Sequence, residues 1–172
     1  MEIHENHDEW KTAFEAGWLA HFKQTGSPDW KAYTRPRNLT RIGGAGVELA
    51  SSRLMLISSA GGYLRETQAP FDAANPLGDY TLRVFAPETP FDQLAFAHEH
   101  YNHAAVNDDP QVLLPLGHLR AMVAEGKIGA LTSVVSIMGF QPDVSRVLAE
   151  TIPAVVLAAR VAQARAALLV PA

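Results

Sequence analysis

The chain has 172 residues, of which 48% are hydrophobic and 19% are charged, so it is long and apolar enough for one globular domain with a substantial core. Its formal net charge of -4 gives no electrostatic reason to expect nucleic acid or an anionic membrane as a partner. Cysteine is absent, which excludes disulfides, thiolate nucleophiles and thiolate metal sites from this sequence.

An amphipathic helix is predicted over residues 7–24, with Asn6 as its cap and Gly26 and Pro28 at its end. The residues before it lack the basic flank and apolar core of a signal peptide, and no apolar run reaches the roughly 18 residues of a membrane span, so a cytoplasmic protein is expected. The helix should pack against the body of the domain or a partner subunit, or else dock onto another protein. Its stripe is aromatic and recurs every four residues: Trp10, Phe14, Trp18 and Phe22.

Prolines indicate an extended linker over residues 27–38. We therefore expect a single α/β domain, 1–172, in which residues 1–38 are the helix and linker and residues 39–172 form the α/β body. The glycines at 43, 44 and 46 do not complete a dinucleotide-binding fingerprint, because Leu49 stands at the third glycine position and no strand precedes them. A turn and a short helix are predicted there.

The body alternates strands and helices. The apolar run 54–58 is typical of a strand buried on both faces of a parallel sheet. Further strands are predicted over 78–85, with Tyr80, Leu82 and Val84 as the alternating apolar residues, and over 111–114, 131–138 and 166–170. One helix is predicted from Leu116 until Gly126 ends it, and another runs from Asp143 or Ser145 to about Gln163, with Pro153 either kinking it or starting a new helix.

This alternation predicts a Rossmann-like three-layer sandwich with a mostly parallel sheet. The sequence stops two residues after the strand 166–170, so the fold is expected to be truncated at its C-terminal side. That strand should then expose an apolar face or edge, which favours a homo-oligomer or a helix swapped from a neighbour.

A glycine- and serine-rich turn follows the first strand. Ser58, Ser59, Gly61 and Gly62 lie where open α/β sheets place their ligand sites, and small residues there let backbone amides approach a ligand. The equally good alternative is a tight turn that needs positive φ at glycine.

Four of the seven histidines lie in one segment: His98, His100, His103 and His118. The run H-E-H-Y-N-H, residues 98–103, superficially matches the H-x-H-x-D-H motif of metallo-β-lactamase-type hydrolases. Asn102 replaces the aspartate that would hold a second metal and the attacking water, which argues against a metal-dependent hydrolase.

A simpler zinc or iron site needs only two of these histidines. His98 and His100 are the candidates, because residues i and i+2 of an extended strand project to the same face. The alternative is that the histidines bond loop backbone and cap Asp108 or Asp109.

Several ordered blocks of the chain resemble the selenoprotein B subunits of the glycine, sarcosine, betaine and D-proline reductases, closest to the D-proline-reductase-like branch. The resemblance covers most of the chain from about Leu54 onward. The blocks are L-I-S-S-A-G-G-Y-L (56–64), P-L-G-D-Y-T-L-R (76–83), H-E-H-Y-N-H-A-A-V-N-D-D-P-Q-V-L-L-P-L-G-H-L-R (98–120), E-G-K-I-G (125–129) and A-A-L-L-V-P-A (166–172).

The resemblance implies a redox subunit for reductive cleavage of a carbon–nitrogen bond in an amino acid or its N-methylated relative, with electrons delivered through thiols and reductase subunits as partners. It also implies a reacting selenocysteine or cysteine in a loop just after the strand 166–170. No residue of this chain matches that position, so the catalytic group is expected just after Ala172 and the present chain is expected to be inactive. A UGA codon read as a stop explains both why the catalytic residue is missing and why the sequence ends just before its expected position.

Two functions from different classes follow. In the first, Ser58, Ser59, Gly61, Gly62, His98, His100 and His103 form walls of a pocket for a small amino-acid-like substrate, whose carboxylate meets the loop amides and whose leaving amine a histidine protonates. In the second, the chain is a non-catalytic homologue that binds a small molecule or a partner subunit.

Overall fold

The computed structural model describes residues 5–37, 46–97 and 101–172. The chain forms two compact units, Met1–Ala45 and Gly46–Ala172, and each is described by itself. The expected boundary, between residues 38 and 39, lies seven residues before the start of the second unit. The glycines at 43 and 44 lie outside the described residues, and the short helix predicted near them is η2 (Leu49–Ser51).

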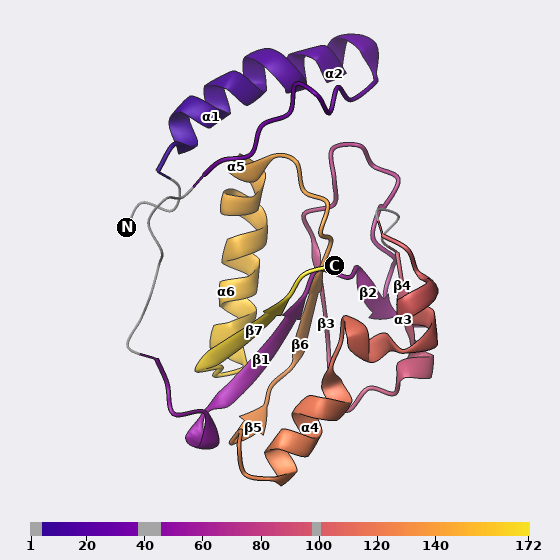
Figure 1. The fold of residues 1–172 in the computed structure, drawn as a ribbon, viewed down its shortest axis with the longest axis vertical. Coiled ribbons are helices and arrows are strands. Elements are labelled where there is room, and N and C mark those ends of the chain that lie inside the picture. Colours follow the sequence, from indigo (N-terminus) through magenta and orange to yellow (C-terminus); the bar gives the residue numbers. More distant parts are fainter. Residues whose placement is uncertain (1–4, 38–45, 98–100) are drawn as a thin grey trace. The chain divides into compact units, whose positions relative to one another are not determined.

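The first unit contains the predicted N-terminal helix. It runs as α1 (His7–Phe14), a π-helical turn η1 (Glu15–Leu19) and α2 (Ala20–Thr25) (Figure 1). Gly26 ends it with a φ of 69°, a left-handed conformation that glycine adopts without steric cost. The predicted cap was wrong: the side chain of Asn6 accepts a hydrogen bond from the backbone N–H of Arg37 at 2.9 Å and makes no cap bond.

The aromatic stripe is confirmed, and the predicted linker covers it. Along the helix, successive rings stack with centroids 4.9, 5.4 and 5.8 Å apart. Tyr33 meets the ring of Phe14 edge-on at 6.2 Å, and Trp30 lies 5.0 Å from Trp18. The indole N–H of Trp10 donates to the carbonyl of Thr34 at 2.7 Å. Residues 27–37 are therefore part of the packed unit rather than a bare spacer.

The second unit is an α/β fold with a mostly parallel sheet, as predicted. β1 (Arg53–Ser58) pairs in parallel with β5 (Ala130–Leu131), β6 (Val134–Ile137) and β7 (Ala166–Val170). β3 (Leu82–Phe85) adds antiparallel to β6. A second sheet, which was not predicted, pairs β2 (Gly62–Leu64) with β4 (Leu94–Phe96) in antiparallel orientation (Figure 1).

Two predicted strands differ in detail. The run 131–138 forms β5 and β6 with a break between them, where Thr132 donates its N–H to the carbonyl of Leu54 at 2.9 Å. The strand predicted over 111–114 was wrong, because Pro110 and the Asp109 side chain, which accepts from Gln111 N–H, start a 3₁₀ turn, η4 (Pro110–Val112).

The helices of this unit begin and end close to their predicted positions. α4 (Leu116–Ala124) ends before Gly126, which has a φ of 71°. The last helix comprises α5 (Val144–Arg146), a π-helical turn η5 (Val147–Thr151) and α6 (Ile152–Val161), and Asp143 caps it as expected. Pro153 lies in the first turn of α6, after the wide turn. The remaining short elements are η3 (Phe91–Gln93) and α3 (Ala104–Asp108).

The main core lies between α4 and one face of the sheet. Leu54 and Leu56 of β1 pack there with Leu116 and Leu119 of α4. Phe85 belongs to this core, whereas Val84, an apolar position of the predicted strand, is 38% exposed. β7 exposes apolar side chains as predicted: Leu169 is 70% exposed. Within the described residues, no helix is long and apolar enough to cross a membrane.

Candidate functional site

The candidate site lies at the carboxyl edge of the parallel sheet, where β1 and β7 end side by side. The N–H of Ser59 donates to the carbonyl of Val170 at 3.0 Å. The hydroxyl of Ser59 in turn accepts a hydrogen bond from the N–H of Ala172 at 2.8 Å. The turn after β1 is thus fixed to the segment after β7, at the edge where open α/β sheets bind ligands.

Ser58 has a structural position. Its side chain is fully buried, and its hydroxyl donates to the carbonyl of Leu113 at 2.8 Å. The same oxygen accepts from the N–H of Ala60 at 3.3 Å. Ser58 therefore joins β1 to the segment before α4 and does not face a ligand in this structure.

The glycines form the tight turn that was one of the two expectations. Gly61 has a φ of 67°, which side chains other than glycine rarely adopt. Its N–H donates to the carbonyl of Ile137 and its carbonyl accepts from Ala97 N–H, both at 3.0 Å. Gly62 is the first residue of β2, and a Cβ there would lie 3.4 Å from the ring of Phe96.

The backbone amides expected to bind a substrate carboxylate already donate hydrogen bonds within the protein. Those of Ser59, Ala60 and Gly61 donate to Val170, Ser58 and Ile137 respectively. A carboxylate does not find these N–H groups in this arrangement, since each already has an acceptor. The partly buried hydroxyl of Ser59 is the polar group of this turn best placed to act on a ligand.

The histidine segment, residues 98–103, is hydrogen-bonded to the same turn through Tyr101. His98 and His100 lie outside the described residues, so their metal-binding role stays a prediction. The hydroxyl of Tyr101 donates to the carbonyl of Ala60 at 3.0 Å, and the ring of His103 lies 4.7 Å from that of Tyr101. Burial raises the pKa of Tyr101 to about 12, so its hydroxyl stays a proton donor at neutral pH.

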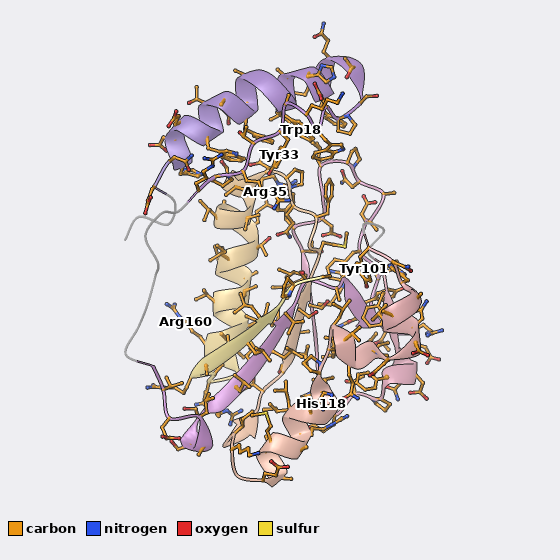
Figure 2. All side chains as sticks on the ribbon, in the orientation of Figure 1. Trp18, Tyr33, Arg35, Tyr101, His118 and Arg160 are labelled. Carbon is orange, nitrogen blue, oxygen red and sulfur yellow. The ribbon has the colours of Figure 1, made fainter. Side chains whose placement is uncertain are left out.

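The nearby polar side chains have local structural roles. The side-chain oxygen of Asn102 accepts from the N–H of Ala104 at 2.9 Å, at the start of α3. Asp109 accepts from Gln111 N–H, as described above. His118 is exposed on α4, well away from Tyr101 (Figure 2). Among residues 5–37, 46–97 and 101–172, no three histidine or carboxylate side chains are arranged to hold a metal ion.

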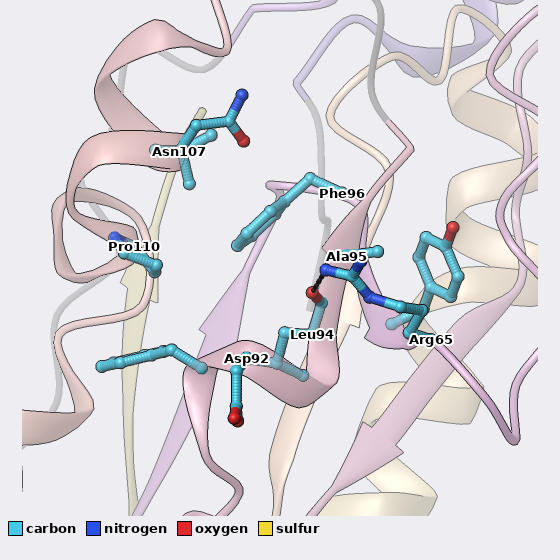
Figure 3. Close-up of a pocket in the computed structure, with 10 residues that line it drawn as sticks. Arg65, Asp92, Leu94, Ala95, Phe96, Asn107 and Pro110 are labelled. Atoms are coloured by element: carbon cyan, nitrogen blue, oxygen red, sulfur yellow. Dashed lines mark hydrogen bonds between the residues drawn. The ribbon is translucent and has the colours of Figure 1, made fainter.

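A cavity of about 610 Å³ is lined by residues of the two elements that lie on either side of the histidine segment in the chain. β4 precedes that segment and α3 follows it, and residues of both line the cavity. Figure 3 shows Asn107 and Pro110 on one side and Phe96 and Arg65 on the other. Arg65 reaches across to the carbonyl of Leu94, to which it donates at 3.0 Å.

This cavity has the mixed lining of a small-molecule site, with aromatic walls and a few polar groups. Sequence reasoning missed it because its strand pair, β2 and β4, has only three residues in each strand. The alternation of Leu94 and Phe96 gives a weak signal, but it reveals nothing about a partner strand 30 residues earlier.

Comparison with known protein families, curated proteins and solved structures found no match to this chain.

Proposed function

We propose that this chain is a redox subunit related to selenoprotein B of the amino-acid reductases, with its substrate pocket at the carboxyl edge of the parallel sheet. The substrate class is a small amino acid or an N-methylated relative, such as glycine, sarcosine, betaine or a proline. The ordered sequence blocks described above motivate the family, and the location of the site rests on the structure.

One observation carries the proposal. The turn 58–62, the segment after β7 and the histidine segment converge at one place, through the Ala172–Ser59 and Tyr101–Ala60 hydrogen bonds of 2.8 and 3.0 Å. In the family that the chain resembles, the reacting selenocysteine or cysteine follows the strand that corresponds to β7. A residue at that position would lie beside Ser59, at the same edge of the sheet as Tyr101 and His103.

The present residues supply binding and proton transfer in this proposal. The hydroxyl of Ser59 orients the substrate, and the neutral Tyr101 holds the turn in place. His103, or His98 or His100, protonates the departing amine. The adjoining cavity, with Arg65 at its wall, receives the rest of the substrate and its carboxylate.

The reduction itself needs a group that this sequence lacks. In the overall reaction two thiols are oxidised to a disulfide, the carbon–nitrogen bond breaks, the carbon gains a hydrogen, and the amine departs with a proton. A low-pKa, polarizable thiolate or selenolate is suited to this attack, whereas serine and histidine are not. The proposal therefore requires a catalytic thiol or selenol that this sequence does not contain.

The finer fold belongs to the same proposal. We place β1, β6 and β7 in a Rossmann-like three-layer sandwich, with α4 and α6 covering opposite faces, because β6 and β7 pair in parallel with the two edges of β1, α4 lies in the chain between β1 and β6, and α6 lies between β6 and β7. We also place the protein in the cytoplasm, where thiol reductants operate.

Reading the coding DNA beyond the codon for Ala172 tests the proposal first. We expect the full gene product to contain a selenocysteine or cysteine that the present sequence lacks, and to consume dithiothreitol in the presence of glycine, sarcosine, betaine or D-proline. Replacing that residue by alanine should abolish the consumption. A gene that encodes no such residue, or a full product without any substrate-dependent thiol oxidation, would contradict the proposal.

The second candidate is a non-catalytic homologue that binds a small molecule or partner subunit, and the absence of cysteine favours it. Both candidates predict ligand binding at the same edge. They differ in that only the redox subunit oxidises thiols, so the assay above separates them.

A further inference from the structure

The exposed half of α6 is apolar, from the side that faces solvent to the side that borders β3. Four large side chains on it are well exposed: Ile152 is 38% exposed, Val156 41%, Leu157 62% and Val161 78%. Arg160 is the charged residue of α6, whose sequence is IPAVVLAARV. A surface helix normally carries polar residues on this side, and a helix that is apolar all round is normally buried.

The apolar surface extends from the helix onto the sheet. A groove of about 520 Å³ runs between α6 and β3, lined by Leu82, Val84, Leu157 and Val161 among others. The strand register puts Leu82 and Val84 on the same face as Val135 and Ile137 of β6. Leu169 of β7 also lies on this face, since it pairs with Ile57 of β1, but β7 is on the other side of β1 from β3 and Leu169 does not line the groove. The apolar patch formed by α6, Leu82 and Val84 indicates an interaction surface.

The charges flanking this patch suit a second copy of the chain. Glu150 and Arg160 are exposed and stand ten residues apart, which is about 15 Å along a helix. When two copies of this helix pack antiparallel about a two-fold axis near the exposed Val156 and Leu157, Arg160 of each copy lies opposite Glu150 of the other. The patch and its charges are therefore self-complementary, as a two-fold interface requires.

Glu150 keeps its own partner in this arrangement. It accepts two hydrogen bonds from Arg146, at 2.6 and 2.9 Å, and these lower its pKa. The carboxylate is thus ionised and oriented on the helix surface before a second copy binds. Exposed ion pairs contribute little free energy, so the apolar side chains supply the affinity and the charges set the orientation.

We propose that the exposed half of α6, with Val156 and Leu157 near its centre and Ile152 and Val161 at its margins, is the interface of a two-fold homodimer in which the helices pack antiparallel. This goes beyond the proposed reductase function and does not depend on it. The first unit is a poorer cover, because its aromatic stripe is already packed against Trp30 and Tyr33.

Sedimentation equilibrium of the whole chain tests the interface. We expect a dimer for the unchanged chain and at least a tenfold weaker association for Leu157→Glu combined with Val161→Glu. Val112→Glu is the matched control, because Val112 is 52% exposed on η4 and lies outside the patch. Arg160→Glu should weaken the dimer several-fold at low salt, and less at high salt, by placing two acids opposite each other.

A cysteine probe locates the axis without relying on destabilising charges. Since the chain has no cysteine, Val156→Cys introduces a single thiol that should form a disulfide-linked dimer on mild oxidation, whereas Val112→Cys should not. A monomer at high concentration, or a dimer that the double variant leaves intact, would overturn the proposal. So would a monomer that binds phosphatidylcholine vesicles through Leu157 and Val161, since the patch would then be a lipid-binding face.

Discussion

The hydroxyl of Tyr101 donates a hydrogen bond to the carbonyl of Ala60, 3.0 Å away and 41 residues earlier in the chain. This bond joins the histidine segment to the turn that follows the central strand β1. Ala60 is fully buried, so its carbonyl would have no solvent partner if the bond were broken. The contact therefore fixes where His103 stands relative to Ser59.

Tyr101→Phe should lower the free energy of unfolding by about 1 kcal/mol, because it leaves the Ala60 carbonyl without this donor. Urea unfolding followed by circular dichroism measures the change. Tyr63→Phe is the control, since it removes a hydroxyl from the same unit without touching this contact. Equal stability losses in the two variants would contradict the role assigned to the Tyr101–Ala60 bond.

Alkaline pH should destabilise the protein through Tyr101. Burial raises its pKa from the usual 10.0 to about 12, so the folded state retains a proton that the unfolded chain loses between these values. The stability supplied by the neutral phenol is complete below pH 10 and is lost as the pH rises toward and through about 12. Thermal unfolding between pH 9 and 12 should show a steeper decline for the unchanged chain than for Tyr101→Phe. Parallel declines would show that Tyr101 does not titrate this way.

The two adjacent serines should separate stability from binding. Ser58→Ala removes the buried bond to the Leu113 carbonyl and should cost about 1 kcal/mol of stability. Ser59→Ala should change stability by no more than about 0.5 kcal/mol, because its side chain is partly exposed, but it should weaken the binding of small amino acids. Unfolding and calorimetric titration of both variants check this, and the reverse pattern would contradict the assignment.

Gly78 and Gly126 form a matched pair with positive φ, 81° and 71°. A Cβ at Gly126 meets no atom within 4 Å, so Gly126→Ala should cost about 1 kcal/mol for the backbone conformation alone. A Cβ at Gly78 would lie 2.6 Å from the carbonyl oxygen of Phe140, which requires the backbone to move. Gly78→Ala should therefore cost a further ~1–3 kcal/mol in chemical denaturation. Equal losses of stability in the two variants would mean that Gly78 and Phe140 are not in such close contact.

The sequence predicted the elements whose pattern is local. The apolar run of β1 and the terminal glycine of α4 each carry their own signal, and Asp143 caps the last helix as its position suggested. The strand expected at 111–114 was wrong, and its apolar residues do not share one environment, since Val112 is 52% exposed. Leu114 is fully buried at the end of a 3₁₀ turn, and burial alone does not distinguish a strand from a turn.

The site was only partly predictable from the sequence. Glycines after β1 indicated either a ligand loop or a tight turn, and only the tertiary partners show that the amides of Ser59 and Gly61 are already used. The pairing of β2 with β4, and hence the cavity between β4 and α3, depends on contacts about 30 residues apart. No local pattern encodes those contacts, because three-residue strands are too short to show a periodicity.

The most direct test of the account is amide NMR of the isotopically labelled chain during titration with glycine, sarcosine, betaine and D-proline. The account predicts saturable shifts at the amides of Ser59, Ala60, Tyr101 and His103 for at least one of these compounds, and their loss in Ser59→Ala. Absence of shifts for all four compounds, or saturable shifts confined to other parts of the chain, would contradict the placement of an amino-acid site at the carboxyl edge of the sheet.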